Sequence, residues 1–258
     1  MFFSKPGTYP PCRMFSFTHI AVLIFCIICI AFFAYKTRNI GSKKLNNITK
    51  IIAISLVVLE SCKIILSFVN GQTNPDSYVP LYFCSIFIYA TILAGFAKGK
   101  LKKLGEAFIG SGGIIAGGVF LISPSTSIET YPMFHFLSCY SMLYHSLMVY
   151  LGIGYLLNGV VVLNKITFIR YIIYCLFFSI IAIVANNIYN TNFMFLREPY
   201  NIPLAFLTPL STDFPVLYTL FILISCIGVT YMLIDFIVRG IKFLTKKESV
   251  KYGKDNFD

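Results

Sequence analysis

Residues 16–35 read SFTHIAVLIFCIICIAFFAY, a run of twenty residues without an aspartate, glutamate, lysine or arginine. A helix of about 20 apolar residues is long enough to cross the hydrocarbon core of a bilayer. The rest of the chain resembles this run, because 57% of its 258 residues are hydrophobic and only 12% are charged. Soluble domains carry about 25% charged residues. The composition therefore excludes an ordinary soluble domain and predicts a protein that crosses a membrane several times.

Seven apolar segments are separated by glycine, asparagine, proline or charged residues. They cover residues 16–35, 48–70, 79–97, 104–122, 133–157, 166–186 and 214–238. Each has the length of a transmembrane helix. We therefore predict an all-α bundle of seven transmembrane helices over residues 16–238, after a short segment 1–15 and before a basic tail 239–258. The fourth segment is rich in glycine, and its Gly113-x-x-x-Gly117 spacing predicts close helix packing.

The 21 basic residues are distributed unevenly between the two predicted sides of the bundle. Seventeen lie in or beside the loops after the first, third and fifth segments, or in the tail. Only Lys5, Arg13 and Arg197 fall on the opposite side, and Lys63 lies within a segment. The positive-inside rule then predicts an N-terminus outside the cell and a cytoplasmic tail. Topology also accounts for the net charge of +11, so we expect no nucleic-acid partner.

The longest connection between segments, residues 187–213, falls on the predicted outer side. It begins with several asparagines and contains Phe193, Phe195 and Phe206. A connection of this length is usually functional or disordered, and its aromatic content argues against disorder. We expect a re-entrant or interfacial segment that folds over the outer mouth of the bundle.

Metal and nucleotide signatures are not found in the sequence. The eight cysteines are scattered, with neither the spacing of a disulfide framework nor the spacing to histidine of a zinc site. A P-loop and an HExxH motif are also absent. We therefore expect no metal and no cofactor.

Ionisable and nucleophilic side chains inside the apolar segments mark a candidate site, because burying them in a membrane is costly. Glu60 and Lys63 lie three residues apart in the second segment, Cys84 lies in the third and His145 in the fifth. A helical rise of about 1.5 Å per residue places all four in one layer of the outer half of the bilayer. Asp235, with Arg239 four residues later, is more typical of an interfacial ion pair.

This layer predicts thiol chemistry. Cys84 follows Pro80 by one turn, so the positive end of a helix dipole would favour its thiolate. His145 would serve as base, and Glu60 would orient the imidazole. Lys63 or the free amides of residues 76–80 would hold an oxyanion. The alternatives are structural: Cys84 as a small packing residue, Glu60 and Lys63 as a buried ion pair, and His145 as a hydrogen-bonding residue between helices.

A family resemblance accompanies these residues. Its motifs are Glu60, Val79-Pro80-Leu81-Tyr82-Phe83-Cys84-Ser85, Tyr131-Pro132-Met133-Phe134-His135-Phe136, Tyr144-His145-Ser146 and Asn190-Thr191-Asn192-Phe193-Met194-Phe195-Leu196 with Pro199. With these motifs the chain resembles, over roughly residues 13–238, the YwaF-like membrane proteins, bacterial relatives of the transmembrane protein 164 acyltransferases. The resemblance implies seven spans and acyl transfer between phospholipids, with the Pro-x-x-x-Cys cysteine, here Cys84, as nucleophile. It leaves His145 or His135 as the base, and many relatives have Gln or His where this chain has Tyr82.

Together these observations predict a multi-pass protein of the cell membrane that acts on phospholipid as a thiol-dependent acyltransferase or hydrolase. The catalytic candidates are Cys84, His145 and Glu60. The substrate-binding candidates are Lys63, Tyr82, His135, Asn186, Asn190 and Asn192. The alternative is a small-solute transporter, or a binding or scaffold protein, that uses the Glu60 and Lys63 pair.

Overall fold

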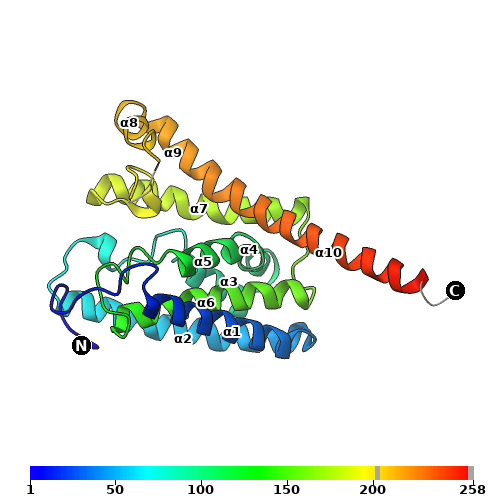
Figure 1. Ribbon diagram of the computed structural model, residues 1–258. Helices are drawn as coiled ribbons and strands as arrows, with labels where there is room; N and C mark the ends of the chain where they lie inside the picture. The colour runs from blue at the N-terminus through cyan, green and yellow to red at the C-terminus, as the bar shows by residue number, and fades with distance from the viewer. Residues whose placement is uncertain (201–203, 255–258) are drawn as a thin grey trace.

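The computed structural model describes residues 1–200 and 204–254, with side chains described as far as Phe243. In this part of the chain every regular element is helical (Figure 1). In chain order the elements are α1 Phe17–Thr37, α2 Gly41–Val69, η1 Pro75–Ser77, α3 Phe87–Phe96, α4 Gly99–Ile109, α5 Gly112–Ile122, α6 Phe136–Leu157, α7 Lys165–Tyr189, η2 Phe193–Phe195, α8 Leu207–Asp213, α9 Pro215–Ile224, η3 Ser225–Val229 and α10 Thr230–Lys254. Pro203 and the side chains of the tail lysines after Lys242 lie outside the described residues.

Six helical stretches are long and apolar enough to cross a membrane. They are α1, α2, the joined α4 and α5, α6, α7, and the α9 to α10 stretch as far as Phe243. Many of their large apolar side chains are exposed on the surface of the bundle, as expected where lipid replaces water. The prediction of an all-helical membrane protein with several spans is confirmed.

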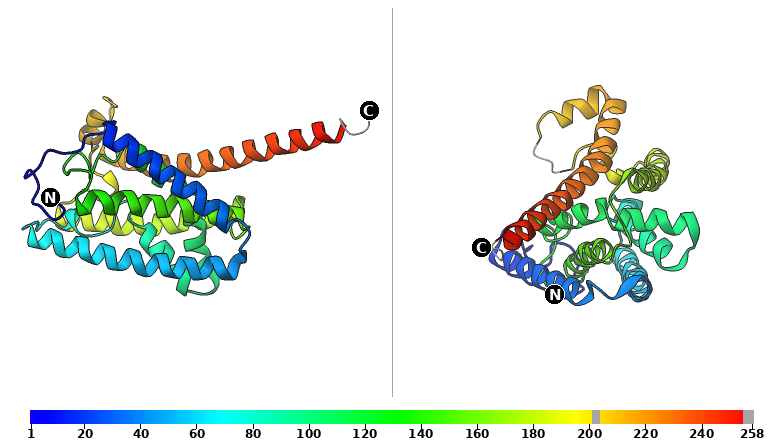
Figure 2. Two further views of the ribbon diagram at one scale, coloured as in Figure 1. Left: turned by 60° about the horizontal axis from the view of Figure 1, so that its bottom comes forward. Right: turned by 90° about the vertical axis from the view of Figure 1, so that its right-hand side faces the viewer.

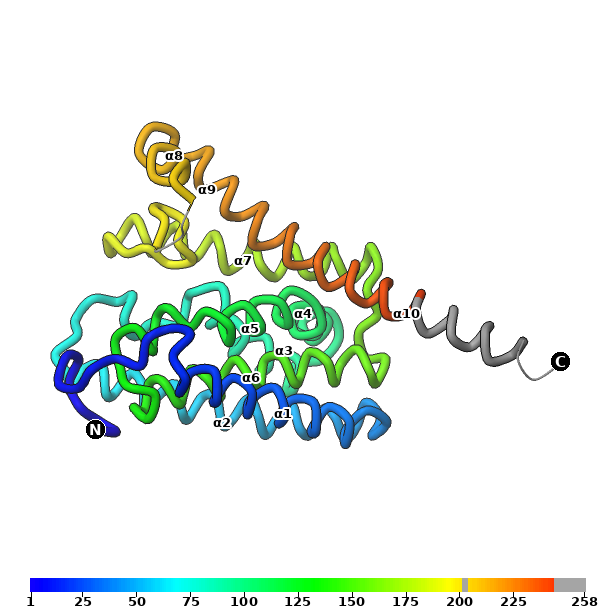
Figure 3. The backbone as a smooth tube through the Cα atoms, viewed as in Figure 1, coloured from blue at the N-terminus to red at the C-terminus, as the bar shows by residue number. Residues whose placement is uncertain are grey.

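The predicted third span is helical over only half of its length. Helix α3 covers Phe87–Phe96, whereas residues 79–86 form irregular turns despite their apolar composition. Pro80 contributes to this break, because it lacks an N–H group and restricts Val79. A ten-residue helix is about 15 Å long, roughly half the hydrocarbon core. The described residues thus contain six long helices and one short apolar helix. The irregular stretch includes Cys84 and leads into α3 (Figure 3).

The predicted fourth span, residues 104–122, is broken into α4 and α5. Gly110 and Ser111 separate them, and Ser111 has non-helical backbone angles (φ −133°, ψ −108°). The predicted close packing holds at Gly117, where an added Cβ would lie 2.9 Å from Val149 and 3.1 Å from the His145 carbonyl oxygen of α6. Gly113 instead faces the Phe108 carbonyl of the preceding helix, at 2.9 Å.

Helices α3 to α5 form the middle of the molecule. Helix α3 packs on α2, α4 packs on α7, and α5 packs on α6, which also contacts α1. Figure 2 shows the same order from two further directions, with the α9 to α10 helix crossing the bundle obliquely and contacting α5 through α10.

The basic loops lie together at one end of the bundle. Asn158, which ends α6, donates from Nδ2 to the Thr37 carbonyl at 2.8 Å and accepts from the Gly41 N–H at 3.1 Å. These two bonds join the α6–α7 loop to the α1–α2 turn. Both loops carry basic residues, as the positive-inside pattern predicts for segments on one side of a membrane.

Two further contacts bring the other basic segments to this end. Lys102 of α4 donates to Asn46 of α2 at 2.6 Å. Tyr231 of α10 donates to the Asn164 carbonyl at 2.9 Å, just before the tail. At the following turn Arg239 pairs with Asp235 at 2.7 Å, which confirms the ion pair expected there.

The N-terminal segment covers the opposite end. The N–H of Cys12 donates to the Tyr131 carbonyl at 3.1 Å, and the N–H of Phe136 donates to the Phe2 carbonyl at 2.9 Å. Asn190 ends α7 in the left-handed conformation (φ 53°) and turns the chain back over this same end. The candidate site therefore lies beneath two loops, at the end remote from the basic clusters.

Candidate active site

Cys84 lies in the irregular turn just before α3. Its Sγ is 3.9 Å from the Ala116 carbonyl oxygen of α5, and its side chain is half-buried. Helix α3 begins three residues later, at Phe87, so Cys84 lies outside the helix at its positive end and not one turn inside it. Cys84 is one of eight free thiols in the chain.

The backbone N–H groups around Cys84 differ from those of the preceding turn. The N–H groups of residues 76–79 donate to Asn74 or Pro75, so the predicted source of oxyanion donors is already occupied. In contrast, the N–H groups of residues 82–85 have no hydrogen-bond acceptor among the described residues. Free N–H groups at the start of a helix attract negative charge. The donors next to the sulfur are therefore those of residues 82–85.

His145 is buried on α6 and has one unpartnered ring nitrogen. Its Nδ1 is 2.7 Å from the Ser141 carbonyl oxygen. A carbonyl only accepts, so Nδ1 carries the proton and Nε2 of the neutral ring carries a lone pair. Nε2 is buried and has no hydrogen-bond partner in the described part of the chain. The ring stacks on Phe120 of α5 at 3.6 Å between ring centroids.

Cys84 and His145 contact the same helix, one turn apart. Cys84 reaches Ala116 and His145 stacks on Phe120, and these two α5 residues are separated by a rise of about 6 Å. The sulfur and the imidazole do not hydrogen-bond to each other in this structure. The structure thus brings both groups to one turn of α5 without joining them.

Glu60 and Lys63 form an ion pair within α2, with Nζ 2.6 Å from Oε1. The other Glu60 oxygen, Oε2, accepts a hydrogen bond from the Tyr140 hydroxyl of α6. Glu60 therefore contacts α6 at Tyr140, one turn before Tyr144. The imidazole of His145 is held by the Ser141 carbonyl and not by Glu60. Lys63 is committed to Glu60, which makes it a poor oxyanion donor.

His135 has both ring nitrogens engaged with backbone. It caps the N-terminus of α6, where Nδ1 accepts from the Leu137 N–H at 3.2 Å. Nε2 then carries the proton and donates to the Ser4 carbonyl at 3.1 Å. The ring stacks on Tyr131 at 4.2 Å, and burial lowers its pKa. Of the two histidines considered as base, His145 has the available nitrogen.

The three asparagine candidates build the loop after α7. Asn186 is buried and bonds to both the N–H and the carbonyl of Phe193. Asn190 accepts from Arg197 at 2.7 Å, and Asn192 accepts from the Arg197 N–H at 3.1 Å. Tyr82, next to the cysteine turn, packs its ring on Phe193. The loop and the cysteine turn therefore pack against each other.

A polar cleft of about 420 Å³ lies between this loop and the segment before Cys84. Its lining residues are Asn74, Asp76, Asn190, Thr191, Asn192, Arg197 and Glu198. Two of the three predicted asparagines thus line a cleft, whereas Asn186 lies beneath it. Burial raises the pKa of the Asp76 carboxyl.

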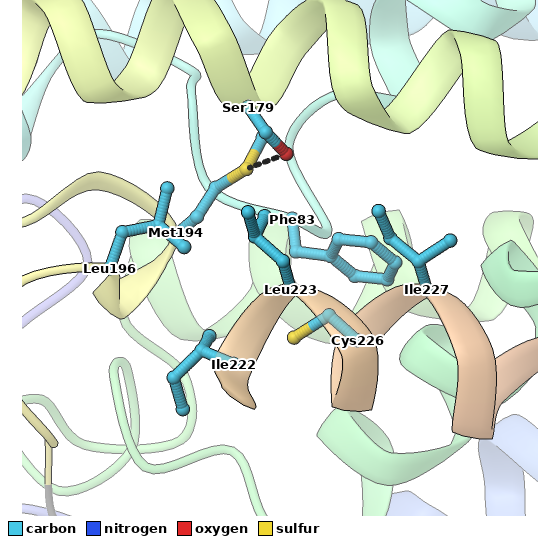
Figure 4. Close-up of a pocket in the computed structure, with 8 residues that line it drawn as sticks. All are labelled: Phe83, Ser179, Met194, Leu196, Ile222, Leu223, Cys226 and Ile227. Carbon is cyan, nitrogen blue, oxygen red and sulfur yellow. Dashed lines mark hydrogen bonds between the residues drawn. The ribbon is translucent and has the colours of Figure 1, made fainter. Parts of the chain in front are cut away.

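A small apolar cavity lies on the other side of the cysteine turn, between α7 and the α9–η3 helix (Figure 4). Phe83, the residue before Cys84, points into it together with Met194 and Cys226. Its volume of about 10 Å³ is close to the space of one water molecule. Apolar side chains from three elements therefore surround the residue that precedes the nucleophile candidate.

Sequence reasoning missed several buried polar residues. Glu106 of α4 is 3% exposed and pairs with Lys103 at 2.7 Å. His19 of α1 is buried and its Nε2 lies 3.2 Å from the Leu121 carbonyl oxygen. Tyr140 and Tyr144 lie four residues apart, on one face of α6, and this spacing was the available signal. Among the described residues, no three His, Cys, Asp or Glu side chains are grouped as a metal site.

Comparison with known proteins identifies the family. The model of the TMEM164 family matches residues 14–233, so the chain belongs to this family. No curated protein matches the chain significantly, and no solved structure does.

Proposed function

We propose that this member of the TMEM164 family is a membrane-embedded lipid acyltransferase or hydrolase that works through an acyl-Cys84 intermediate. The protein would belong to the YwaF-like bacterial branch of the family and lie in the cell membrane. Residues 79–97 would add a seventh crossing, with an extracytoplasmic N-terminus and a cytoplasmic tail. The site then lies in the outer half of the bilayer, within reach of phospholipid ester bonds.

One observation carries the proposal: the buried His145 ring, whose Nε2 has a free lone pair, stacks on Phe120 of α5, one helical turn from Ala116, which the half-buried Cys84 thiol contacts. A buried acceptor without a partner costs free energy, about 1–3 kcal/mol. A catalytic role is one explanation for such a group, and an imidazole is the side chain most often used as a general base. His145 Nε2 is therefore the proposed base for the Cys84 thiol, after a movement that brings the two groups into hydrogen-bond reach.

The proposed reaction has two steps. Cys84 Sγ attacks the carbonyl carbon of a phospholipid ester, the S–C bond forms, and the ester C–O bond breaks. His145 takes the thiol proton and returns it to the departing lysophospholipid oxygen. In the second step a lysophospholipid hydroxyl or water attacks the thioester carbon, a C–O bond forms, and His145 accepts the hydroxyl proton. The C–S bond then breaks, and His145 returns that proton to the Cys84 thiolate. The free N–H groups of residues 82–85 would stabilise the oxyanion in both steps.

The remaining candidates have supporting roles in this proposal. Glu60, paired with Lys63 and Tyr140, holds α2 against α6 and does not act directly on the imidazole. Tyr82, Asn190 and Asn192 line the approach from the outer end of the bundle, where a phospholipid head group would lie. His135 and Asn186 shape that end by tying the loops together.

Acyl exchange by purified protein tests the proposal. The protein is reconstituted in nanodiscs with a phospholipid labelled in one acyl chain and an unlabelled lysophospholipid. Cys84→Ala should abolish label transfer and fatty-acid release. Cys139→Ala, which removes another part-buried thiol on α6, is the matched control and should leave the rate unchanged. Label transfer by Cys84→Ala at the wild-type rate would reject Cys84 as the nucleophile.

A further inference from the structure

Two buried tyrosine hydroxyls hold the backbone of the cysteine turn. The Tyr144 hydroxyl of α6 lies 3.2 Å from the Cys84 carbonyl oxygen and 3.0 Å from the Ser85 carbonyl oxygen. The Tyr174 hydroxyl of α7 donates to the Ile86 carbonyl at 2.7 Å. Two hydroxyls from two different helices thus lie on three successive carbonyls, with the one Tyr144 hydrogen shared between the Cys84 and Ser85 oxygens. Both tyrosines are almost completely buried, at 4% and 2% exposure.

These donors are additional to the hydrogen bonds of the turn itself. The carbonyls of Cys84 and Ser85 already accept from the N–H groups of Phe87 and Ile88. The carbonyls therefore have partners without the tyrosines, and the hydroxyl contacts satisfy the buried hydroxyls and also restrain the direction of the peptide groups. Since a peptide group is planar, fixing the Cys84 carbonyl also fixes the N–H of Ser85.

The anchoring of Tyr144 extends across the bundle. Its ring packs edge-on against Tyr140 at 5.6 Å, and Tyr140 donates to Glu60 of α2. A second edge-on contact joins Tyr144 to Phe87, the first residue of α3, at 5.8 Å. The position of the hydroxyl is therefore determined by three helices, whereas the turn that it holds is irregular.

We propose that Tyr144 is a positioning residue for Cys84. Its hydroxyl holds the Cys84 and Ser85 peptide groups so that Sγ lies against Ala116 of α5 and the free N–H groups of the turn keep their direction. Tyr174 holds the next peptide group and has a smaller influence on the sulfur. The proposal rests on the proposed function for its catalytic meaning, but the geometry of the clamp can be tested without any acyl transfer.

The test measures the alkylation rate of Cys84 by a small membrane-permeant maleimide, resolved by mass spectrometry of the labelled peptides. Tyr144→Phe removes only the hydroxyl and keeps the ring contacts. We expect Cys84 to react roughly five- to tenfold faster in this variant, the factor that the loss of one hydrogen bond corresponds to. The exposed Cys62 of α2 is an internal control and should keep its rate.

Two further variants separate positioning from general loosening of the fold. Tyr174→Phe should accelerate Cys84 labelling less than Tyr144→Phe does. Tyr231→Phe, which removes a hydroxyl at the basic end, should leave it unchanged. Equal Cys84 rates in wild-type protein and Tyr144→Phe would overturn the clamp, and so would equal acceleration in all three variants.

The rate of acyl exchange should change in the opposite direction to the rate of alkylation. If Cys84 is the nucleophile, Tyr144→Phe should lower kcat and leave KM nearly unchanged while it raises the alkylation rate. A wild-type protein without acyl exchange would contradict the proposed function, and the alkylation result would still decide the clamp.

Discussion

His135 and His145 stand ten residues apart, one at the start of α6 and one within it, and both are buried but differently bonded. His135 uses both ring nitrogens on backbone groups, one at the start of α6 and one in the N-terminal segment. His145 uses one nitrogen within its own helix and leaves the other free. Burial alone therefore does not separate the two histidines, whereas the count of hydrogen-bonded ring nitrogens does.

The largest expected effect separates the two histidines by activity. His145→Gln should lower acyl exchange by roughly 10²- to 10⁴-fold, the usual contribution of a general base. His135→Asn should keep activity within about twofold, because asparagine also caps helix N-termini. Rates are measured in nanodiscs with labelled phospholipid. Equal losses in both variants would show that the free nitrogen of His145 has no special role.

A second variant tests whether Glu60 acts on His145 or only on its own neighbours. Glu60→Gln leaves Lys63 without its counter-charge, so we expect a lower melting temperature and a loss of about 2 kcal/mol, below the cost of fully buried pairs because Lys63 is partly exposed. Thermal unfolding in detergent measures it. The pH dependence of acyl exchange should keep its midpoint, and a displaced midpoint would restore Glu60 as the group that orients the imidazole.

A third pair of variants disturbs His145 but not His135. In Gly117→Ala the new methyl would lie 3.1 Å from the His145 carbonyl oxygen, which pushes α6 away from α5 at that level. We expect a loss of about 1–3 kcal/mol and slower acyl exchange. Gly118→Ala is the matched control, since its methyl would meet open space. Both are measured by thermal unfolding and activity, and identical behaviour of the two would remove helix contact as the cause.

The smallest expected effect is the pH dependence contributed by His135. Burial lowers its pKa, so between the folded and the unfolded pKa the unfolded chain binds more protons. Stability should therefore fall as the pH drops below about 6.5, the pKa of an unperturbed histidine. His135→Asn should flatten the melting temperature between about pH 5 and 7. If His135→Asn leaves the slope of melting temperature against pH unchanged, another group causes the pH dependence of stability.

The sequence predicts the membrane class well because hydropathy is summed over twenty residues. It predicts individual contacts poorly, because the segment packed beside a hydroxyl determines which acceptor that hydroxyl meets. Tyr144 and Tyr174 look like ordinary apolar-segment tyrosines until α3, α6 and α7 are assembled. Depth estimates put Cys84 and His145 in one layer, and in the structure they contact Ala116 and Phe120, one turn apart on α5. They could not show that Glu60 would turn toward Tyr140.

The breaks in the predicted spans have the same origin. Gly110 and Ser111 interrupt a continuous apolar run, and an averaged hydropathy does not register a change of backbone direction. Glu106 lies near the start of the predicted span 104–122 and is buried beside Lys102 and Lys103, with which it pairs.

Asn158 has a consequence for biosynthesis. Its amide makes the two hydrogen bonds that close the first helical hairpin at Thr37 and Gly41, which precede it by 121 and 117 residues. A ribosome releases these earlier positions long before it adds this asparagine. Helices α1 and α2 are therefore made before these two hydrogen bonds can form, because the bonds require the end of α6.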